Sequence, residues 1–456
     1  MVPGAERLER LQSKALKSGK PLRLECSKIH HSPCVAHIVS KPKSRRFALI
    51  TRCLSKINPL IAILFLLVVS SAVFGQRATG RVTKLTIKSA VLGEDRVVLV
   101  RTPVGYETNK VSYPVLYMTD GDAHMGHTAS TIEFLSQNGR IEELIVVGIT
   151  NTDRTRDLTP VRSTAKDPAG NLQAPTSGGA DNFLKFIETE LIPQIEKQYR
   201  VQPYRIFAGH SLGGLFAIHS MITKPGLFNA YIAVSPSLQW ANKEAMKRVE
   251  EFLKNQKEMK ATLFVSIGNE LGAIGETFDS LKELLSKTDI KGFEWQAERM
   301  SDEDHGSVVL RSHYVGLRKV YEGWQGPRDL KSGAVLGGLK GADAHYKKLS
   351  EKFGYNIPVP ENLINQMGYQ FLFEGKPDEA IAVFKANTER YPASANVYDS
   401  LAEAYERQGR LDLAVPLYDK ARMLSQENGD PNAATFKANF ERANAKAKEK
   451  LATPKQ

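Results

Sequence analysis

The stretch Tyr204-Arg-Ile-Phe-Ala-Gly-His-Ser-Leu-Gly-Gly214 decides the fold of this chain. Residues 204–208 have the apolar, bulky composition of a buried strand, and residues 212–222 read as a helix. Between them lies a Gly-x-Ser-x-Gly sequence centred on Ser211. A serine at a sharp strand-to-helix turn, flanked by glycines where neighbouring side chains would collide, is the setting of a nucleophile elbow. We therefore predict that Ser211 projects above a sheet as a reactive hydroxyl.

The sequence on both sides of this turn alternates strand and helix patterns. Strands are expected at residues 82–87, 96–101, 113–118, 144–149, 231–234, 263–267 and 293–298, and an amphipathic helix at 180–198. Strands that alternate with helices imply a mostly parallel sheet. With the serine turn inside it, residues 80–325 are predicted to form an α/β domain of the α/β-hydrolase fold.

A serine hydroxyl needs a base to remove its proton, and in this fold the chain order is nucleophile, acid, histidine. The histidines after Ser211 are His219, His305, His313 and His345. His219 lies on the helix that follows the elbow and cannot face back to it, and His345 lies beyond the predicted domain. His313 falls in the last predicted helix, where packing or exposure is expected. His305, in the polar loop 301–307, is therefore the predicted base.

The acid of the triad is expected at Glu270, because a loop at the carboxyl end of the strand 263–267 can reach the histidine. The competing carboxylates are Glu276, Asp279, Asp302 and Asp304. The oxyanion of acyl transfer needs two backbone donors. We expect them at the N–H of Leu212, directly after the nucleophile, and at the N–H of Asp122, where Gly121 gives the backbone freedom to turn.

The loop 151–159 follows a predicted sheet strand and should border the substrate pocket. Asn151, Arg154 and Arg156 are candidates to bind an anionic or hydroxyl-rich acyl group; the alternative is a salt-bridged loop. Trp240 is a candidate wall of the pocket, and the alternative is a buried aromatic residue near the sheet edge.

Several motifs together carry a resemblance to a known family. They are residues 113–122, residues 146–160, Gly209 to Gly214, Ser235-Pro-Ser237 and Asp304-His-Gly306. In this order they resemble the family of putative esterases, which includes enterochelin esterase-like and esterase D-like enzymes. The resemblance implies hydrolysis of carboxylic esters through a serine acyl-enzyme, without a metal or organic cofactor.

The resemblance does not choose a substrate, because one fold serves many reactions. Family members act on siderophore lactones, feruloyl or acetyl sugar esters and formylglutathione, so the expected substrate is a small-molecule ester, either a siderophore-type lactone or an acylated sugar. An acyltransferase using the same residues is one alternative. A non-catalytic binding protein that acts through the C-terminal helices is the other.

The C-terminal part contains a repeat. Residues 326–359 are expected to form a linker and a leading helix, and residues 361–394 align with 395–428 at a constant offset of 34. The aligned pairs are Met367 with Leu401, Gly368 with Ala402, Phe371 with Tyr405, Gly375 with Gly409, Ala380 with Ala414 and Phe384 with Tyr418. This period resembles tetratricopeptide repeats, so residues 360–452 are predicted to form an all-α domain that can bind a protein partner. The alternative is a pair of ordinary amphipathic hairpins.

The formal net charge of +12 is concentrated near the start, where residues 1–57 hold thirteen Lys or Arg against three Glu. With almost no excess charge elsewhere, no nucleic-acid partner is expected. The basic extension 1–57 is what a start codon assigned too early would produce. It precedes an apolar run and small residues at 58–76, as in a secretory signal. We expect an exported protein, periplasmic or extracellular, associated with a membrane only if residues 58–76 stay uncleaved.

All three cysteines, Cys26, Cys34 and Cys53, lie upstream of that segment, so thiol chemistry is not expected after cleavage. His124 and His127 are close in sequence but lack a nearby third ligand, so no metal site is predicted.

Overall fold

The computed structural model describes residues 80–326, 328–329 and 333–452. The predicted basic extension 1–57 and the predicted signal segment 58–76 lie outside these residues. Within the described part, no helix is both long and apolar enough to cross a membrane.

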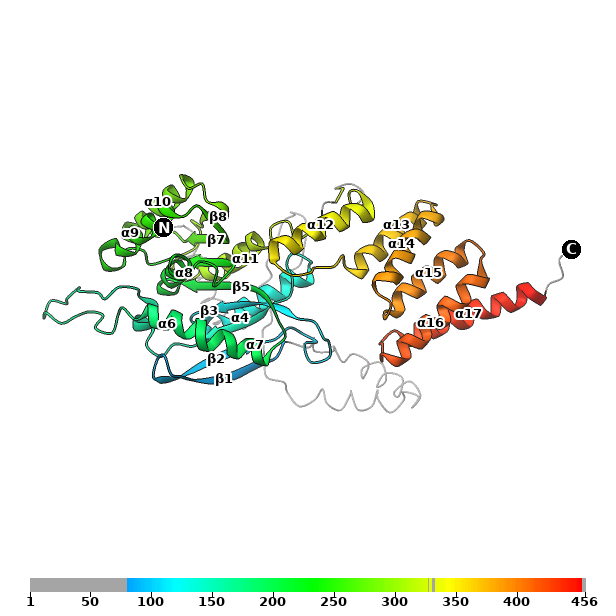
Figure 1. Cartoon of the computed structure of the whole chain (residues 1–456), viewed down its shortest axis with the longest axis horizontal. Coiled ribbons are helices and arrows are strands. Elements are labelled where there is room, and N and C mark those ends of the chain that lie inside the picture. Colours follow the sequence, from blue (N-terminus) through cyan, green and yellow to red (C-terminus); the bar gives the residue numbers. More distant parts are fainter. Residues whose placement is uncertain (1–79, 327, 330–332, 453–456) are drawn as a thin grey trace, which may run out of the picture. The chain divides into compact units, whose positions relative to one another are not determined.

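The described residues contain an eight-stranded sheet in the order β1-β2-β4-β3-β5-β6-β7-β8. Figure 1 labels β1, β2, β3, β5, β7 and β8 of this sheet. Its strands are β1 (Val82–Ser89), β2 (Glu94–Arg101), β3 (Tyr113–Met118), β4 (Ile145–Ile149), β5 (Val201–His210), β6 (Ala230–Val234), β7 (Glu258–Ile267) and β8 (Lys291–Arg299). The β1–β2 and β2–β4 pairs are antiparallel, and every other pair is parallel. The predicted α/β class with a mostly parallel sheet is confirmed, and β5, β7 and β8 are longer than expected.

Helices cover both faces of this sheet. One face packs against α4 (Gly121–Gln137), α11 (Val308–Val320) and α12 (Gly338–Phe353), and the other against α6 (Ala180–Phe186), the π-helical turn η1 (Ile187–Leu191), α7 (Ile192–Gln198), α8 (Leu212–Thr223), α9 (Trp240–Asn255) and α10 (Gly272–Ser286). Successive strand residues enter opposite cores because side chains alternate along a strand: Leu116 joins the first core and Tyr117 the second. The predicted helix 180–198 is present with η1 in its middle.

Helix α12 packs on the α/β domain through Phe353. The Phe353 ring lies 4.8 Å from Tyr204, 5.0 Å from Tyr321 and 5.6 Å from Trp324, measured between ring centroids. The helix expected to lead the C-terminal repeats therefore also closes one core of the sheet.

The C-terminal region is helical. Its helices are α13 (Glu361–Phe373), α14 (Pro377–Arg390), α15 (Ala395–Arg407), α16 (Leu411–Glu427) and α17 (Ala433–Ala452). The pairs α13–α14 and α15–α16 begin at positions that differ by the 34 residues of the sequence repeat. A Cβ atom on Gly368 would lie 2.4 Å from the Phe384 ring, so only a glycine fits where these helices cross.

Candidate active site

Ser211 occupies a strained turn between β5 and α8. Its backbone has φ 59° and ψ −114°, which L residues other than glycine rarely adopt. The neighbouring β6 and the loop after it hold this turn: the Ser211 N–H donates to Val234 O (2.9 Å), and the Ser237 N–H donates to Ser211 O (3.1 Å). A Cβ atom on Gly209 would lie 2.2 Å from the carbonyl oxygen of Gly213, so the turn closes only with glycine there. The sequence-predicted elbow geometry is present.

His305 and Glu270 form a close pair. His305 Nδ1 lies 2.6 Å from Glu270 Oε2, and the Glu270 side chain is 9% exposed. The other carboxylate oxygen, Oε1, accepts hydrogen bonds from the Ser235 hydroxyl (2.6 Å) and the Gly268 N–H (3.2 Å). A carboxylate held in this way favours a proton on Nδ1, which leaves Nε2 of a neutral imidazole free to accept one.

The competing carboxylates have other partners. Glu276 pairs with Lys243 (3.2 Å), Asp279 with Arg299 (2.8 Å) and Asp302 with Arg311 (2.6 Å), while Asp304 accepts the backbone N–H groups of Gly306 and Ser307. Glu270 is the carboxylate that the fold brings to the His305 ring.

The Ser211 hydroxyl lies 3.3 Å from the Ser237 hydroxyl. Among the described residues no hydrogen bond joins Ser211 to His305, and such contacts often tighten only when substrate binds. The two are linked through the residue before the serine, because His210 Nε2 lies 2.7 Å from the carbonyl oxygen of His305 and the two imidazole rings are 4.6 Å apart. The loop that carries His305 is thus held at the elbow.

Two helices begin at the predicted oxyanion site. Leu212 is the first residue of α8 and Asp122 the second residue of α4, and N–H groups in the first turn of a helix have no intrahelical acceptor. The two helix starts lie close together, since a Cβ atom on Gly213 would lie 2.2 Å from the hydroxyl oxygen of Thr119, two residues before α4.

Asn151 and Arg154, predicted to bind substrate, direct their polar groups at Asp120. Asp120 Oδ1 accepts from Asn151 Nδ2 (2.7 Å) and Arg154 Nε (2.6 Å), and Arg154 also donates to the carbonyl oxygen of His210 (3.0 Å). Burial alone would raise the pKa of Asp120, but the hydrogen bonds and charge of Arg154, with help from Asn151, hold it below its usual value. This geometry favours a structural role, in which both residues hold the loop after β3 against the elbow.

The remaining two pocket candidates also have partners. Arg156 forms ion pairs with Glu94 (2.6 Å) and Asp157 (2.7 Å), which matches the salt-bridged alternative. The Trp240 indole donates from Nε1 to Val161 O (2.8 Å) and packs against a core of the sheet. Trp240 thereby ties down the segment that follows α5 (Arg154–Leu158).

The other histidines near the site are buried or half-buried. Burial, followed by the charges of His305 and His124, lowers the pKa of His210 to about 4. Burial also lowers the pKa of His124 and of His127. His313 is buried, and its Nδ1 lies 2.8 Å from the Thr128 hydroxyl. In the part of the chain that the structure covers, no group of three or more His, Cys, Asp or Glu side chains is arranged to bind a metal.

Sequence reasoning assigned no role to four residues that the fold brings into this site. They are Asp120, His210, Ser235 and Ser237. Each lies at the carboxyl end of a parallel strand, at the edge of the sheet where ligands of α/β proteins bind, so position alone marks them as candidates.

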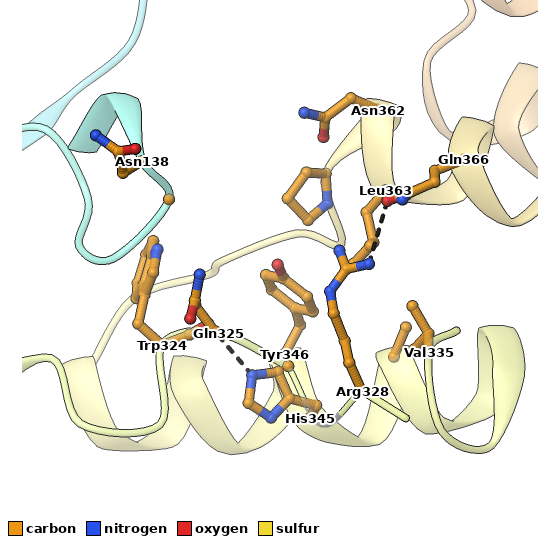
Figure 2. A pocket seen from close by; sticks show the side chains of 14 residues that line it. Asn138, Trp324, Gln325, Arg328, Val335, His345, Tyr346, Asn362, Leu363 and Gln366 are labelled. Carbon is orange, nitrogen blue, oxygen red and sulfur yellow. Dashed lines mark hydrogen bonds between the residues drawn. The ribbon is translucent and has the colours of Figure 1, made fainter. Parts of the chain in front are cut away.

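A separate pocket of about 340 Å³ lies where the Asn138–Gly139 turn, the chain after α11, α12 and the start of α13 meet (Figure 2). Trp324, Gln325, Tyr346 and His345 are among its lining residues. None of the predicted catalytic residues lines it, which places His345 away from the candidate site.

Fold and site together define an α/β-hydrolase-type protein, in which a strained serine ends a central parallel strand and a His–Glu pair follows later strands. A family profile described as "Putative esterase" matches residues 89–306. The ferri-bacillibactin esterase BesA of Bacillus subtilis is 30% identical over 219 residues, which is 43% of this chain and 75% of the relative. The siderophore enterobactin esterase of Emericella nidulans is 29% identical over 238 residues, covering 42% of this chain and 77% of that one. The chain belongs to the putative esterase family of ester hydrolases.

A solved structure agrees with this assignment. An IroE-like serine hydrolase from Shewanella oneidensis has 28% sequence identity and a TM-score of 0.59, and the match covers 68% of this chain and all of the other.

Proposed function

We propose that this protein is an exported serine esterase in which Ser211 is the nucleophile, His305 the general base and Glu270 the acid that orients it. The observation that carries the proposal is the His305–Glu270 contact of 2.6 Å beside the strained Ser211 turn. The order Ser, Glu, His along the chain is that of α/β-hydrolases, and the similar Shewanella oneidensis structure is described as a serine hydrolase.

The chemistry follows from these positions. His305 Nε2 removes the Ser211 proton as the serine oxygen attacks the ester carbonyl carbon, and the N–H groups of Leu212 and Asp122 stabilise the oxyanion. Collapse of this intermediate breaks the bond to the alcohol oxygen, which takes the proton from His305. Water then repeats the sequence on the acyl-enzyme and releases the acid. Glu270 keeps the imidazole in the required tautomer throughout.

For the substrate we propose a siderophore-type lactone ester. The support comes from relatives described as esterases of ferri-bacillibactin, enterobactin and triacetylfusarinine C. An acylated sugar is the substrate to test beside it.

The experiment is labelling of residues 77–456 with a fluorophosphonate probe, together with turnover of a short p-nitrophenyl ester. Labelling and turnover that disappear in Ser211→Ala, and turnover that disappears in His305→Ala, are expected while the fold stays intact. Full turnover in either variant would contradict the proposal. A product that carries the acyl group on an added alcohol instead of water would replace the esterase by an acyltransferase.

Two further parts of the proposal concern the rest of the chain. Residues 58–76 would act as the export signal after the basic extension 1–57, and a precursor that is shortened on secretion would support this. Residues 360–452 would form a tetratricopeptide-like domain that binds a protein partner. Its support is the agreement between the helix starts and the 34-residue sequence repeat, with small residues such as Gly368 at a helix crossing.

A further inference from the structure

His210, the residue before the proposed nucleophile, forms a hydrogen bond with the proposed base. Its Nε2 lies 2.7 Å from the backbone carbonyl oxygen of His305, and its ring centroid lies 4.6 Å from that of His305. A carbonyl oxygen accepts only, so Nε2 of His210 carries the proton and donates. The hydrogen bond therefore joins the end of β5 to the loop after β8.

The backbone of this loop is also held by the Asn269 N–H, which donates to Glu303 O (2.6 Å), but that contact lies two residues before His305. The His305 side chain is 44% exposed, and Asp302 and Asp304 beside it are exposed and paired within their own neighbourhood. The Glu270 carboxylate fixes the Nδ1 side of the ring, but it does not fix how far the ring reaches toward Ser211. A second contact on the backbone of His305 supplies that missing constraint.

We propose that His210 is a positioning residue, which holds the His305 imidazole at the distance from Ser211 that proton transfer requires by donating a hydrogen bond to the His305 carbonyl. The inference rests on the proposed function, and it assigns a second, distinct task to the elbow sequence. A displacement of about 1 Å in a reacting group costs on the order of 100-fold in rate.

The surroundings of His210 suit this task. The ionisable groups that face it are His305, His124 on α4 (ring centroids 5.7 Å apart), Asp120 after β3, and Arg154 on α5, which donates to the His210 carbonyl oxygen. Burial and the two imidazoles keep the pKa of His210 at about 4. His210 therefore stays neutral when His305 becomes an imidazolium during the reaction, and it adds no second positive charge 4.6 Å away.

The test compares two substitutions of His210 in residues 77–456. In His210→Gln the amide N–H donor lies at nearly the same distance from the backbone as the imidazole Nε2. In His210→Leu the side chain has a similar volume but no donor. We expect kcat for a p-nitrophenyl ester to fall by about 10- to 100-fold in His210→Leu with KM nearly unchanged. His210→Gln should keep kcat within about 3-fold of the wild-type value, because its amide N–H can still donate to the His305 carbonyl oxygen.

His219→Gln is the matched control. His219 is also buried, its pKa is also lowered to about 4 by burial, and its Nε2 lies 2.8 Å from Asp181 Oδ1 on α6. This variant should leave kcat, KM and the pH profile unchanged. Thermal unfolding of all variants shows whether each is folded.

Several outcomes would overturn the inference. They are wild-type kcat in His210→Leu, loss confined to KM, and equal losses of kcat in His210→Leu and His210→Gln. If His210→Leu does not fold, His210→Gln decides alone, and loss of its fold or its kcat refutes the need for a donor. Wild-type protein that hydrolyses no ester and takes no fluorophosphonate label would overturn the proposed function, and this inference with it.

Discussion

Replacing Glu270 by Gln should nearly abolish esterase activity, although the two side chains have almost the same shape. Oε1 of Glu270 accepts from the Gly268 N–H (3.2 Å) and the Ser235 hydroxyl (2.6 Å), and Oε2 accepts from His305 Nδ1 (2.6 Å). The hydroxyl can reverse its direction, but the backbone N–H cannot. The amide oxygen of Gln must therefore take the Oε1 position, and its NH₂ group must face His305.

This orientation forces the wrong tautomer on the base. His305 Nδ1 has to accept from the amide, so the proton moves to Nε2, where the Ser211 proton should arrive. In serine proteases the corresponding change lowers kcat about 10⁴-fold, and we expect a loss of about 10³- to 10⁴-fold here, or about 4 to 5.5 kcal/mol of transition-state stabilisation.

The assay is kcat and KM for a p-nitrophenyl ester at neutral pH, with thermal unfolding as a check on the fold. Glu276→Gln and Asp279→Asn are matched controls, because these carboxylates pair with Lys243 and Arg299 and should leave kcat unchanged. Glu270→Gln protein that is folded and keeps more than about a tenth of wild-type kcat would refute the tautomer argument.

Two predictions concern stability. Phe353→Ala should lower the free energy of unfolding by about 3 to 5 kcal/mol, because Phe353 is 2% exposed and packs among three aromatic residues. Phe373 is 80% exposed, so Phe373→Ala is the control and should change this free energy by less than about 0.5 kcal/mol. Urea denaturation measures both values. Burial, which outweighs the hydrogen bond from Tyr355, raises the pKa of Glu142 from 4.5 to about 7. The folded state therefore holds this proton more tightly than the unfolded state, so stability should fall as pH rises from about 4.5 to 7, and Glu142→Gln should flatten that fall.

The sheet could be predicted well because each strand has a recognisable local pattern of apolar residues. Residues 113–118 form a short run that is buried throughout in β3, and such runs point to strands covered on both faces. The Ser211 turn and the place of His305 after β8 also follow from local pattern and chain order. The roles of Ser211, His305 and Glu270 stay predictions, although the arrangement of the three agrees with them.

Side-chain partners were harder to predict, because they depend on distances across the fold. Nothing in the loop 151–159 indicates that Asn151 and Arg154 face Asp120, about thirty residues earlier in the chain. In the same way, the pattern of α12 identifies its apolar face but not the Tyr204 and Tyr321 rings against which Phe353 packs. The periodicity of a sequence predicts which face of a helix is buried, but only the tertiary structure shows which residues that face packs against.

The candidate site is built by backbone links between neighbouring strands rather than by side-chain contacts alone. The Ser211 N–H donates to Val234 O (2.9 Å), the Ser235 N–H to Ser266 O (2.7 Å), and the Asn269 N–H to Glu303 O (2.6 Å). Each link ties the loop after one strand to the next strand or loop in the series β5, β6, β7, β8. Because these strands are adjacent in the order in which they occur in the chain, the sheet register sets the spacing of Ser211, Glu270 and His305. No motif marks Glu270, yet its place after β7 puts its carboxylate between the Ser235 hydroxyl and the His305 ring.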